Sequence, residues 1–262
     1  MLYAIKVILE LHWGYSIKRP IFSASQPVLL VPPPSSLLGA LARALAYFNG
    51  MSENTLIGGE LYSSASLLIR DIPWITLALS DKRFISPILG LIESRDIIRA
   101  LIAPYQRSQH IYPGSRVLFG IQPHGRIYAP SMRLNLIYLA KDKNLGKYAW
   151  CITSLGNKES VVSVLDVHVT EIKLNIDDDE IETFYYFPSS LGEVIEGRFL
   201  KETLSKPSLE HYKLGAAKDL AENCEEFTIP LTKVRVKLYG NAKAITAGGE
   251  TIVIPQQVIK DE

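Results

Sequence analysis

One long stretch of this chain carries basic and aromatic side chains and no acidic residue. No Asp or Glu occurs between Asp96 and Asp142, a span of 45 residues. Guanidinium groups fork onto phosphates and aromatic rings stack on unpaired bases, so this composition indicates an anionic ligand, with nucleic acid as the leading candidate. A solvated, irregular surface is the plainer alternative. The cations are Arg99, Arg107, Arg116, Arg126, Arg133 and Lys141, interleaved with Tyr105, His110, Tyr112, Phe119, His124 and Tyr128.

Some of these residue types could also cleave RNA without a metal. Such cleavage needs a base near the 2′-hydroxyl, an acid for the leaving oxygen and a cation for the phosphorane charge. His110, Tyr112 and His124 have suitable chemistry beside arginines, although the same side chains can stack on bases without moving a proton. The five histidines show no HxxxH or HExxH spacing, and no GxSxG or Walker motif occurs. We therefore expect no metal, no cofactor and no small-molecule substrate.

The charge of the chain is unevenly distributed, although the total is only +1. Residues 1–165 carry 17 Lys and Arg against 9 Asp and Glu, a net charge of +8. Residues 166–226 carry 6 bases and 15 acids, a net charge of −9. A partner for the acidic region could be a basic protein surface, or the region could keep RNA off the wrong face.

Composition excludes several protein classes. Apolar residues make up 47% of the 262 residues, which is enough for a buried core and too much for a disordered chain. Cys151 and Cys224 form no CxxC motif and cannot supply a disulfide scaffold. Five prolines interrupt the uncharged stretch 20–42, and no basic leader precedes an apolar signal core. We expect a cytoplasmic protein that does not cross a membrane.

The elements that would position these residues can be read from hydrophobic periodicity. Alternation predicts strands over residues 2–12 and 134–140, and most clearly over 161–172. A strand with a bend at Pro73 is predicted over residues 66–80. Helical spacing predicts one helix that starts at a serine N-cap at Ser35-Ser36 and ends at Asn49-Gly50, and another over 145–155 between Asn144 and Gly156.

The predicted order is strand, helix, strand, strand, helix, strand. This order is typical of an α+β, ferredoxin-like βαββαβ core of the kind found in RNA-recognition motifs. Residues 81–133 are far too long for a hairpin turn between the second and third strands, so they form an insertion that projects from the sheet. We place a first domain at residues 1–173 and a mainly β C-terminal subdomain at 174–262, with one strand over 227–238 and a hairpin turn at 247–250.

Two segments resemble a known family. Residues 31–42, Val-Pro-Pro-Pro-Ser-Ser-Leu-Leu-Gly-Ala-Leu-Ala, are similar to the Pro-Pro-Ser-x-x-Gly signature of the "Cas five" family of CRISPR-associated proteins, within the RAMP superfamily. Residues 154–162, Ser-Leu-Gly-Asn-Lys-Glu-Ser-Val-Val, resemble that family's Leu-Gly-x-x-Glu-Ser turn. The resemblance covers residues 1–172 well and the tail poorly, and it is greatest to the archaeal type I-A branch.

The resemblance implies a function. Members of this family hold the 5′ handle of a CRISPR RNA inside the Cascade surveillance complex and cap a filament of backbone subunits with a projecting β-thumb. It therefore implies CRISPR RNA, the backbone subunit and the large subunit as partners, and a thumb within residues 81–133. One branch of the family cleaves CRISPR repeats without a metal, so a metal-independent endoribonuclease is the alternative to a non-catalytic RNA-binding subunit.

The candidate RNA-binding residues come from the first motif, the loop before it, the basic stretch and the second motif. Gly39 could let a ligand approach the helix backbone, or could permit close packing of the helix on the sheet. The N–H groups of the first helical turn could bind a phosphate. The complete set is Lys18, Arg19, Ser35, Ser36, Gly39, Arg43, Arg107, His110, Tyr112, Arg116, Arg126, Arg133 and Lys158.

Overall fold

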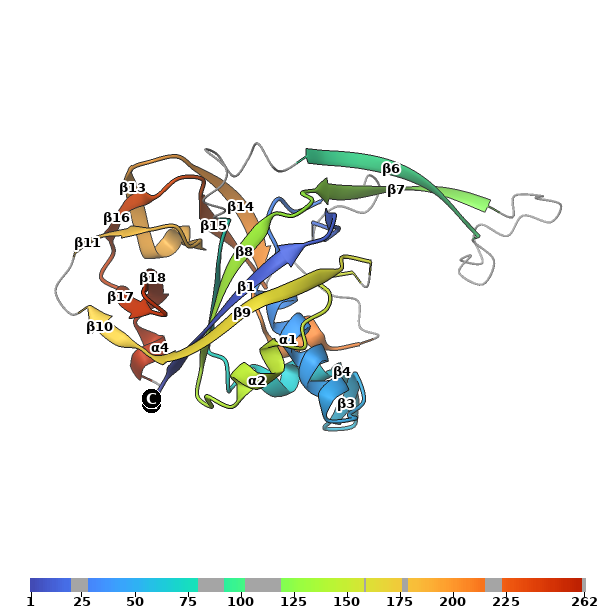
Figure 1. The fold of residues 1–262 in the computed structure, drawn as a ribbon, viewed down its shortest axis with the longest axis horizontal. Coiled ribbons are helices and arrows are strands. Elements are labelled where there is room, and N and C mark those ends of the chain that lie inside the picture. The colour runs from blue at the N-terminus through green and yellow to red at the C-terminus, as the bar shows by residue number, and fades with distance from the viewer. Residues whose placement is uncertain are drawn as a thin grey trace.

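A four-stranded antiparallel sheet forms the centre of the protein (Figure 1). Its order is β5 (Trp74–Ala78), β8 (Arg133–Ala140), β1 (Tyr3–Leu11) and β9 (Val162–Glu171). The structure, a computed structural model, describes residues 1–19, 28–79, 92–101, 119–157, 159–175, 179–214 and 223–260. The predicted strands over 2–12, 134–140 and 161–172 are confirmed, and in β1 every second residue from Ile5 to Leu11 is buried.

Both faces of this sheet are covered over part of their area. Helices α1 (Pro34–Phe48) and α2 (Leu145–Ala149) lie on the face that carries the fully buried side chains of Val7, Leu9 and Leu11 (Figure 1). The hairpin of β17 (Ala242–Ala247) and β18 (Glu250–Pro255) packs against the other face, on Ala4 and Ile137. Within the described residues, no helix is both long and apolar enough to cross a bilayer.

Three sequence predictions about these elements were wrong in detail. Pro33, not a serine, is the N-cap of α1, and Pro34 occupies the first helical position, where its missing N–H has no cost. Helix α2 ends at Ala149, although Ile152 and Leu155 beyond it are buried as their spacing predicted. Residues 66–80 are not one strand, since Ser64–Leu68 form a 3₁₀ helix (η1) before β5.

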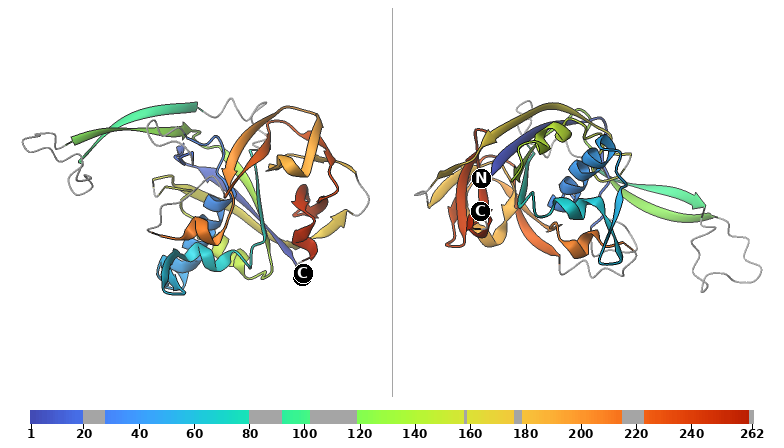
Figure 2. Two further views of the ribbon diagram at one scale, coloured as in Figure 1. Left: turned by 180° about the vertical axis from the view of Figure 1, so that it is seen from behind. Right: turned by 90° about the horizontal axis from the view of Figure 1, so that it is seen from below.

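The predicted insertion contains a long two-stranded ribbon. Strands β6 (Ile92–Leu101) and β7 (Phe119–Tyr128) pair along their whole length and extend away from the body (Figures 1 and 2). The base of the ribbon is attached by β2 (Gly14–Tyr15), which pairs with Ile127 and Tyr128. Gly14 has φ +142°, and a Cβ there would lie 1.8 Å from the carbonyl oxygen of Ile127, so only glycine permits this pairing.

The C-terminal part is mainly β, as predicted. Its strands form three small sheets, and the turn at 247–250 is a tight hairpin with positive φ at Gly248 and Gly249. Residues 227–238 are two strands rather than one. The bounds are β10 Lys173–Asn175, β11 Glu180–Thr183, β12 Phe187–Pro188, η4 Ser189–Leu191, β13 Gly192–Glu196, β14 Phe199–Ser205, α3 Leu209–Tyr212, β15 Cys224–Pro230, β16 Val234–Leu238 and α4 Gln257–Lys260.

The hydrophobic core crosses the predicted boundary at residue 173. Tyr186, Leu204 and Phe227 from the C-terminal part belong to the same buried cluster as the helix-facing side chains of β1. The hydroxyl of Thr76 in β5 also donates to the carbonyl oxygen of Tyr186 over 2.7 Å. The two predicted domains are therefore packed together through a shared core.

Candidate nucleic-acid interface

A groove of about 380 Å³ runs along the first half of α1. One wall is the helix itself at Ser36, Gly39 and Arg43, and the facing wall contains Ser154 and Gly156. The β-hairpin of β3 (Asn54–Ile57) and β4 (Glu60–Ser63) and the short helix α3 close its sides. The groove is therefore assembled from four separate parts of the chain.

The two family-like motifs meet in this groove. Arg43 Nη1 donates a hydrogen bond of 2.5 Å to Ser154 Oγ, although the two residues are 111 positions apart in the sequence. The second motif forms a tight turn in which the Leu155 N–H donates to the Ser160 carbonyl oxygen over 2.9 Å. Gly156 has φ +77°, and a Cβ there would lie 2.6 Å from Ile17 Cγ1. The turn is thus fixed against the body and presents Ser154 to the helix.

Gly39 lies in the middle of α1 and faces open space. A Cβ added at this position would have no atom of the described residues within 4 Å, so close packing of the helix on the sheet is not the reason for a glycine here. Glycine in a helix interior costs about 1 kcal/mol relative to alanine. The described part of the chain therefore gives no steric reason for a glycine at position 39.

The first turn of α1 is poorly suited to the phosphate binding that the sequence predicted for its N–H groups. Pro34 has no N–H, and the N–H groups of Ser36 and Leu37 donate to the Pro33 carbonyl oxygen. Few backbone donors therefore remain for a phosphate. Ser35 is buried, and its hydroxyl bonds with that of Ser205 over 2.6 Å. Ser35 thus fixes the helix to β14, whereas Ser36 is partly exposed and lines the groove.

Comparison with known proteins gives the family of the chain. It is 32% identical over 204 residues to the CRISPR system aCascade subunit Cas5 1 of Saccharolobus solfataricus, covering 77% of this chain and 78% of that protein. It is 30% identical, with the same coverage, to the CRISPR-associated protein Cas5 3 of that organism. This chain belongs to the Cas5 family. No model of a protein family matches it.

A solved structure shares the fold. A CRISPR protein from Archaeoglobus fulgidus superposes with a TM-score of 0.59 at 21% identity, over 97% of this chain and 100% of that one. The fold is therefore shared over nearly the whole of this Cas5 chain, including the C-terminal part that the two motifs do not cover.

Sequence analysis missed the contribution of α3 to the groove. Tyr212 donates a hydrogen bond of 2.7 Å to the Ser35 carbonyl oxygen, and burial raises its pKa, so the phenol stays protonated. His211 lies in the groove wall, with its ring 5.1 Å from that of Tyr212. The one local signal is Ser208, which caps α3 by accepting from the His211 N–H.

Arg19 has a structural contact in this Cas5 chain. Its Nη2 lies 3.0 Å from Oε1 of Glu202, a carboxylate only 5% exposed that also accepts from the Leu30 N–H. Burial raises the pKa of Glu202, while Arg19 and the Leu30 N–H act in the opposite direction. This cluster ties the loop before α1 to β14. Lys18, next to it, is exposed.

The described part of the basic stretch also makes contacts within the chain. The Arg126 guanidinium lies 5.7 Å from the centre of the Trp13 ring and 3.6 Å from Glu159. Arg133 Nε lies 3.4 Å from Glu10. His124 falls on β7, where its backbone is opposite Asp96. The candidates Arg107, His110, Tyr112, Arg116 and Lys158 lie outside the described residues.

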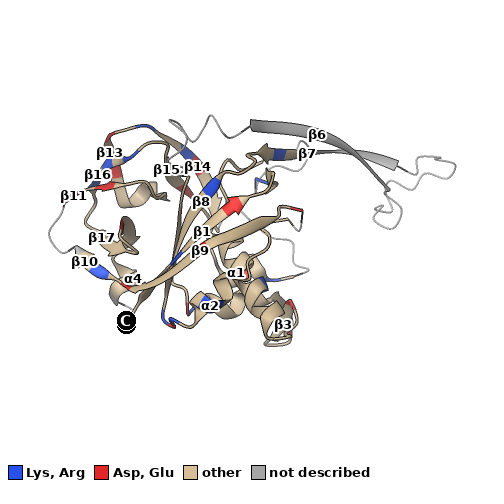
Figure 3. Ribbon diagram, in the orientation of Figure 1, with Lys and Arg blue, Asp and Glu red and all other residues tan. Residues whose placement is uncertain are grey.

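Charges of both signs occur close together in the C-terminal part (Figure 3). Lys201 pairs with Glu226, and Arg235 pairs with Glu196 over 2.6 Å. Glu182 likewise pairs with Lys233. Several carboxylates of the acidic region 166–226 are therefore neutralised locally, within the same part of the fold.

Proposed function

We propose that this Cas5 chain is a non-catalytic RNA-binding subunit of a type I CRISPR Cascade complex and that it holds the 5′ handle of the CRISPR RNA in the α1 groove. One named relative is an aCascade subunit, which supports a place in such a complex. The observation that carries the proposal is Gly39, a helix-interior glycine that faces open space in a groove built from both family-like motifs.

The groove has the chemistry for a phosphodiester backbone. Arg43 is oriented by its hydrogen bond to Ser154 and by the Glu53 carboxylate 3.7 Å from its Nε, so its guanidinium group has a fixed orientation at the groove wall. The side chain of Ser36 and the imidazole of His211 add hydrogen-bonding groups on either side. Phosphate contacts of this kind position a strand, and the missing Cβ of Gly39 lets the strand lie against the helix.

The projecting ribbon supports a second part of the proposal. β6 and β7 extend from the body as the family's β-thumb would, so we infer that this Cas5 chain caps the backbone filament through the ribbon and also contacts the large subunit (Figure 2). The strand order β5-β8-β1-β9, with α1 after β1 and α2 after β8, supports a ferredoxin-like classification of the core. The type I-A branch and a cytoplasmic location are part of the same proposal.

One incubation tests the RNA-binding proposal and its catalytic alternative together. Labelled full-length repeat RNA is mixed with the purified chain in EDTA and resolved on native and denaturing gels. We expect a shift without cleavage that is lost when the 5′ handle is scrambled. Specific cleavage would instead favour the endoribonuclease and make His110, Tyr112 and His124 the first residues to mutate. No shift, with or without the backbone subunit, would contradict the proposal.

A further inference from the structure

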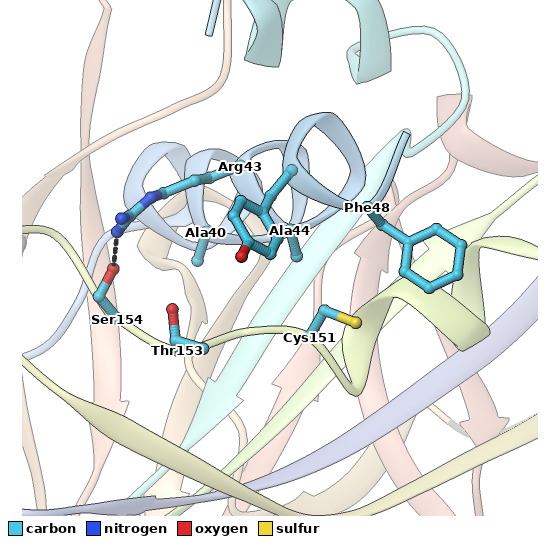
Figure 4. A pocket seen from close by; sticks show the side chains of 8 residues that line it. Ala40, Arg43, Ala44, Phe48, Cys151, Thr153 and Ser154 are labelled. Carbon is cyan, nitrogen blue, oxygen red and sulfur yellow. Dashed lines mark hydrogen bonds between the residues drawn. The ribbon is translucent and has the colours of Figure 1, made fainter. Parts of the chain in front are cut away.

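A second pocket adjoins the groove at the other end of α1. It has a volume of about 570 Å³ and shares Ala40, Arg43 and Ser154 with the groove. Its floor is made by the small side chains of Ala40 and Ala44 and by Cys151, and Thr153 projects from the facing segment (Figure 4). The pocket is thus a continuation of the groove that is larger and more apolar.

Two aromatic rings stand at the rim of this pocket. Tyr47 is 87% exposed and Phe48 is 61% exposed, which is unusual for large rings at the end of an amphipathic helix. The Phe48 ring is held by an edge-on contact with Tyr148, with ring centres 5.4 Å apart. Because Phe48 is already held in place, a flat ligand can stack there with little loss of side-chain freedom.

The opposite end of the pocket is polar. Arg43 and Ser154 form a hydrogen-bonded pair that lines both the pocket and the groove (Figure 4). The hydroxyls of Thr153 and Ser154 can donate to or accept from the edge of a ligand. An unpaired base is bound by features of this kind: an apolar floor, exposed aromatic rings, hydroxyl groups at the edge and a guanidinium group beside the phosphates. The pocket has all of them.

We propose that this pocket receives one unpaired base of the RNA strand whose phosphates lie in the α1 groove. The inference rests on the proposed function and extends it. The base stacks against Tyr47 and Phe48, its edge faces Thr153, and Arg43 contacts the adjoining phosphate. A protein side chain is the other occupant that such a surface could take, and the test below separates the two.

The test uses single-stranded RNAs of repeat sequence in which 2-aminopurine replaces one base at a time, bound to the purified full-length chain. We expect one position at which fluorescence is strongly quenched by stacking. Tyr47→Ala removes most of that quenching and weakens binding about tenfold, because stacking on one ring contributes that much to affinity. Leu56→Ala, an exposed apolar side chain of β3 outside the pocket, leaves both unchanged.

Ala44→Trp provides an independent check of the base pocket, because the larger side chain fills the pocket floor and takes the space of the base. If that variant misfolds, Tyr47→Ala alone decides, since Tyr47 is almost fully exposed. RNA that binds with no quenched position, or with quenching that Tyr47→Ala leaves intact, overturns the base pocket and leaves the groove proposal standing. A chain that binds no RNA overturns both.

Discussion

A glycine and an arginine occur together in two regions of this Cas5 chain. The fold leaves no room for a side chain at the glycine of one region and leaves open space at the glycine of the other. At the base of the ribbon, a Cβ on Gly14 would lie 1.8 Å from a carbonyl oxygen, and Arg126 lies over Trp13 and beside Glu159. In the α1 groove, a Cβ on Gly39 would have no described atom within 4 Å, and Arg43 donates to the Ser154 hydroxyl and lies 3.7 Å from Glu53. The fold requires the first glycine, whereas the described residues give no steric reason for the second.

The difference allows residues that the fold requires to be told apart, by experiment, from residues that the proposed ligand requires. A glycine that the fold requires cannot be replaced without steric overlap, and a glycine that a ligand requires can be replaced without harm to the free protein. Stability and RNA affinity should therefore respond in opposite ways in the two regions.

The largest expected effect is on Gly14. Gly14→Ala should lower the free energy of unfolding by about 3–5 kcal/mol, because the new Cβ overlaps the backbone of β7 at a φ that L residues rarely adopt. Chemical denaturation measures the change. Gly240→Ala is the matched control, since a Cβ there has no atom within 4 Å. A Gly14→Ala protein as stable as the wild type would show that β2 does not pair with β7.

Arg43 should affect RNA binding more than stability. Arg43→Ala removes one aligned cation from the groove, so we expect an affinity loss of about tenfold and a decrease of about one in the slope of log K against log salt. Arg235→Ala removes an exposed cation that pairs with Glu196 in the C-terminal part and should change neither quantity. An equal loss of RNA affinity in Arg43→Ala and Arg235→Ala would mean that the groove contributes no more to RNA binding than any exposed cation does.

Glu202, which is buried in β14 and pairs with Arg19, tests whether a charge near the loop before α1 stabilises the fold. Because burial raises its pKa in the folded state, the folded protein holds the proton to higher pH than the unfolded chain does. The stability that this proton contributes is complete below the ordinary carboxyl pKa and is lost as pH rises through the raised value. The free energy of unfolding of the wild type, minus that of Glu202→Gln, should therefore increase from about pH 7 to about pH 4.5. A difference that stays constant with pH would contradict this assignment.

The sheet could be predicted from the sequence because alternate burial leaves a period-2 pattern. In β1, every second residue from Ile5 to Leu11 is buried, and the pattern specified both the strand and its inner face. The same kind of reasoning predicted a helix over 145–155, which is longer than α2 (Leu145–Ala149). Ile152 and Leu155 are buried at helical spacing, yet turns after Trp150 bury them equally well, so periodicity did not fix the end of the helix.

The groove could be predicted only in part. The sequence offered Gly39 and Arg43 as candidates, but not Ser154, and the hydrogen bond between Arg43 and Ser154 over 111 sequence positions follows from the fold. Sequence alone left Gly39 with two explanations, and the open space around it argues against close packing on the sheet. Helix α3 was missed because its position depends on long-range packing of Tyr212 against the start of α1, which leaves no periodic pattern in the sequence.

Gly39→Ala tests the central claim most directly. Alanine should raise the free energy of unfolding by about 0.5–1 kcal/mol, because it suits a helix better and meets no neighbour. The same methyl group should weaken binding of repeat RNA about tenfold by blocking its approach to the helix, a loss of about 1.4 kcal/mol. A more stable protein with weaker RNA binding is the result that we predict. A Gly39→Ala protein that binds the 5′ handle as tightly as the wild type would contradict the assignment of this groove to RNA.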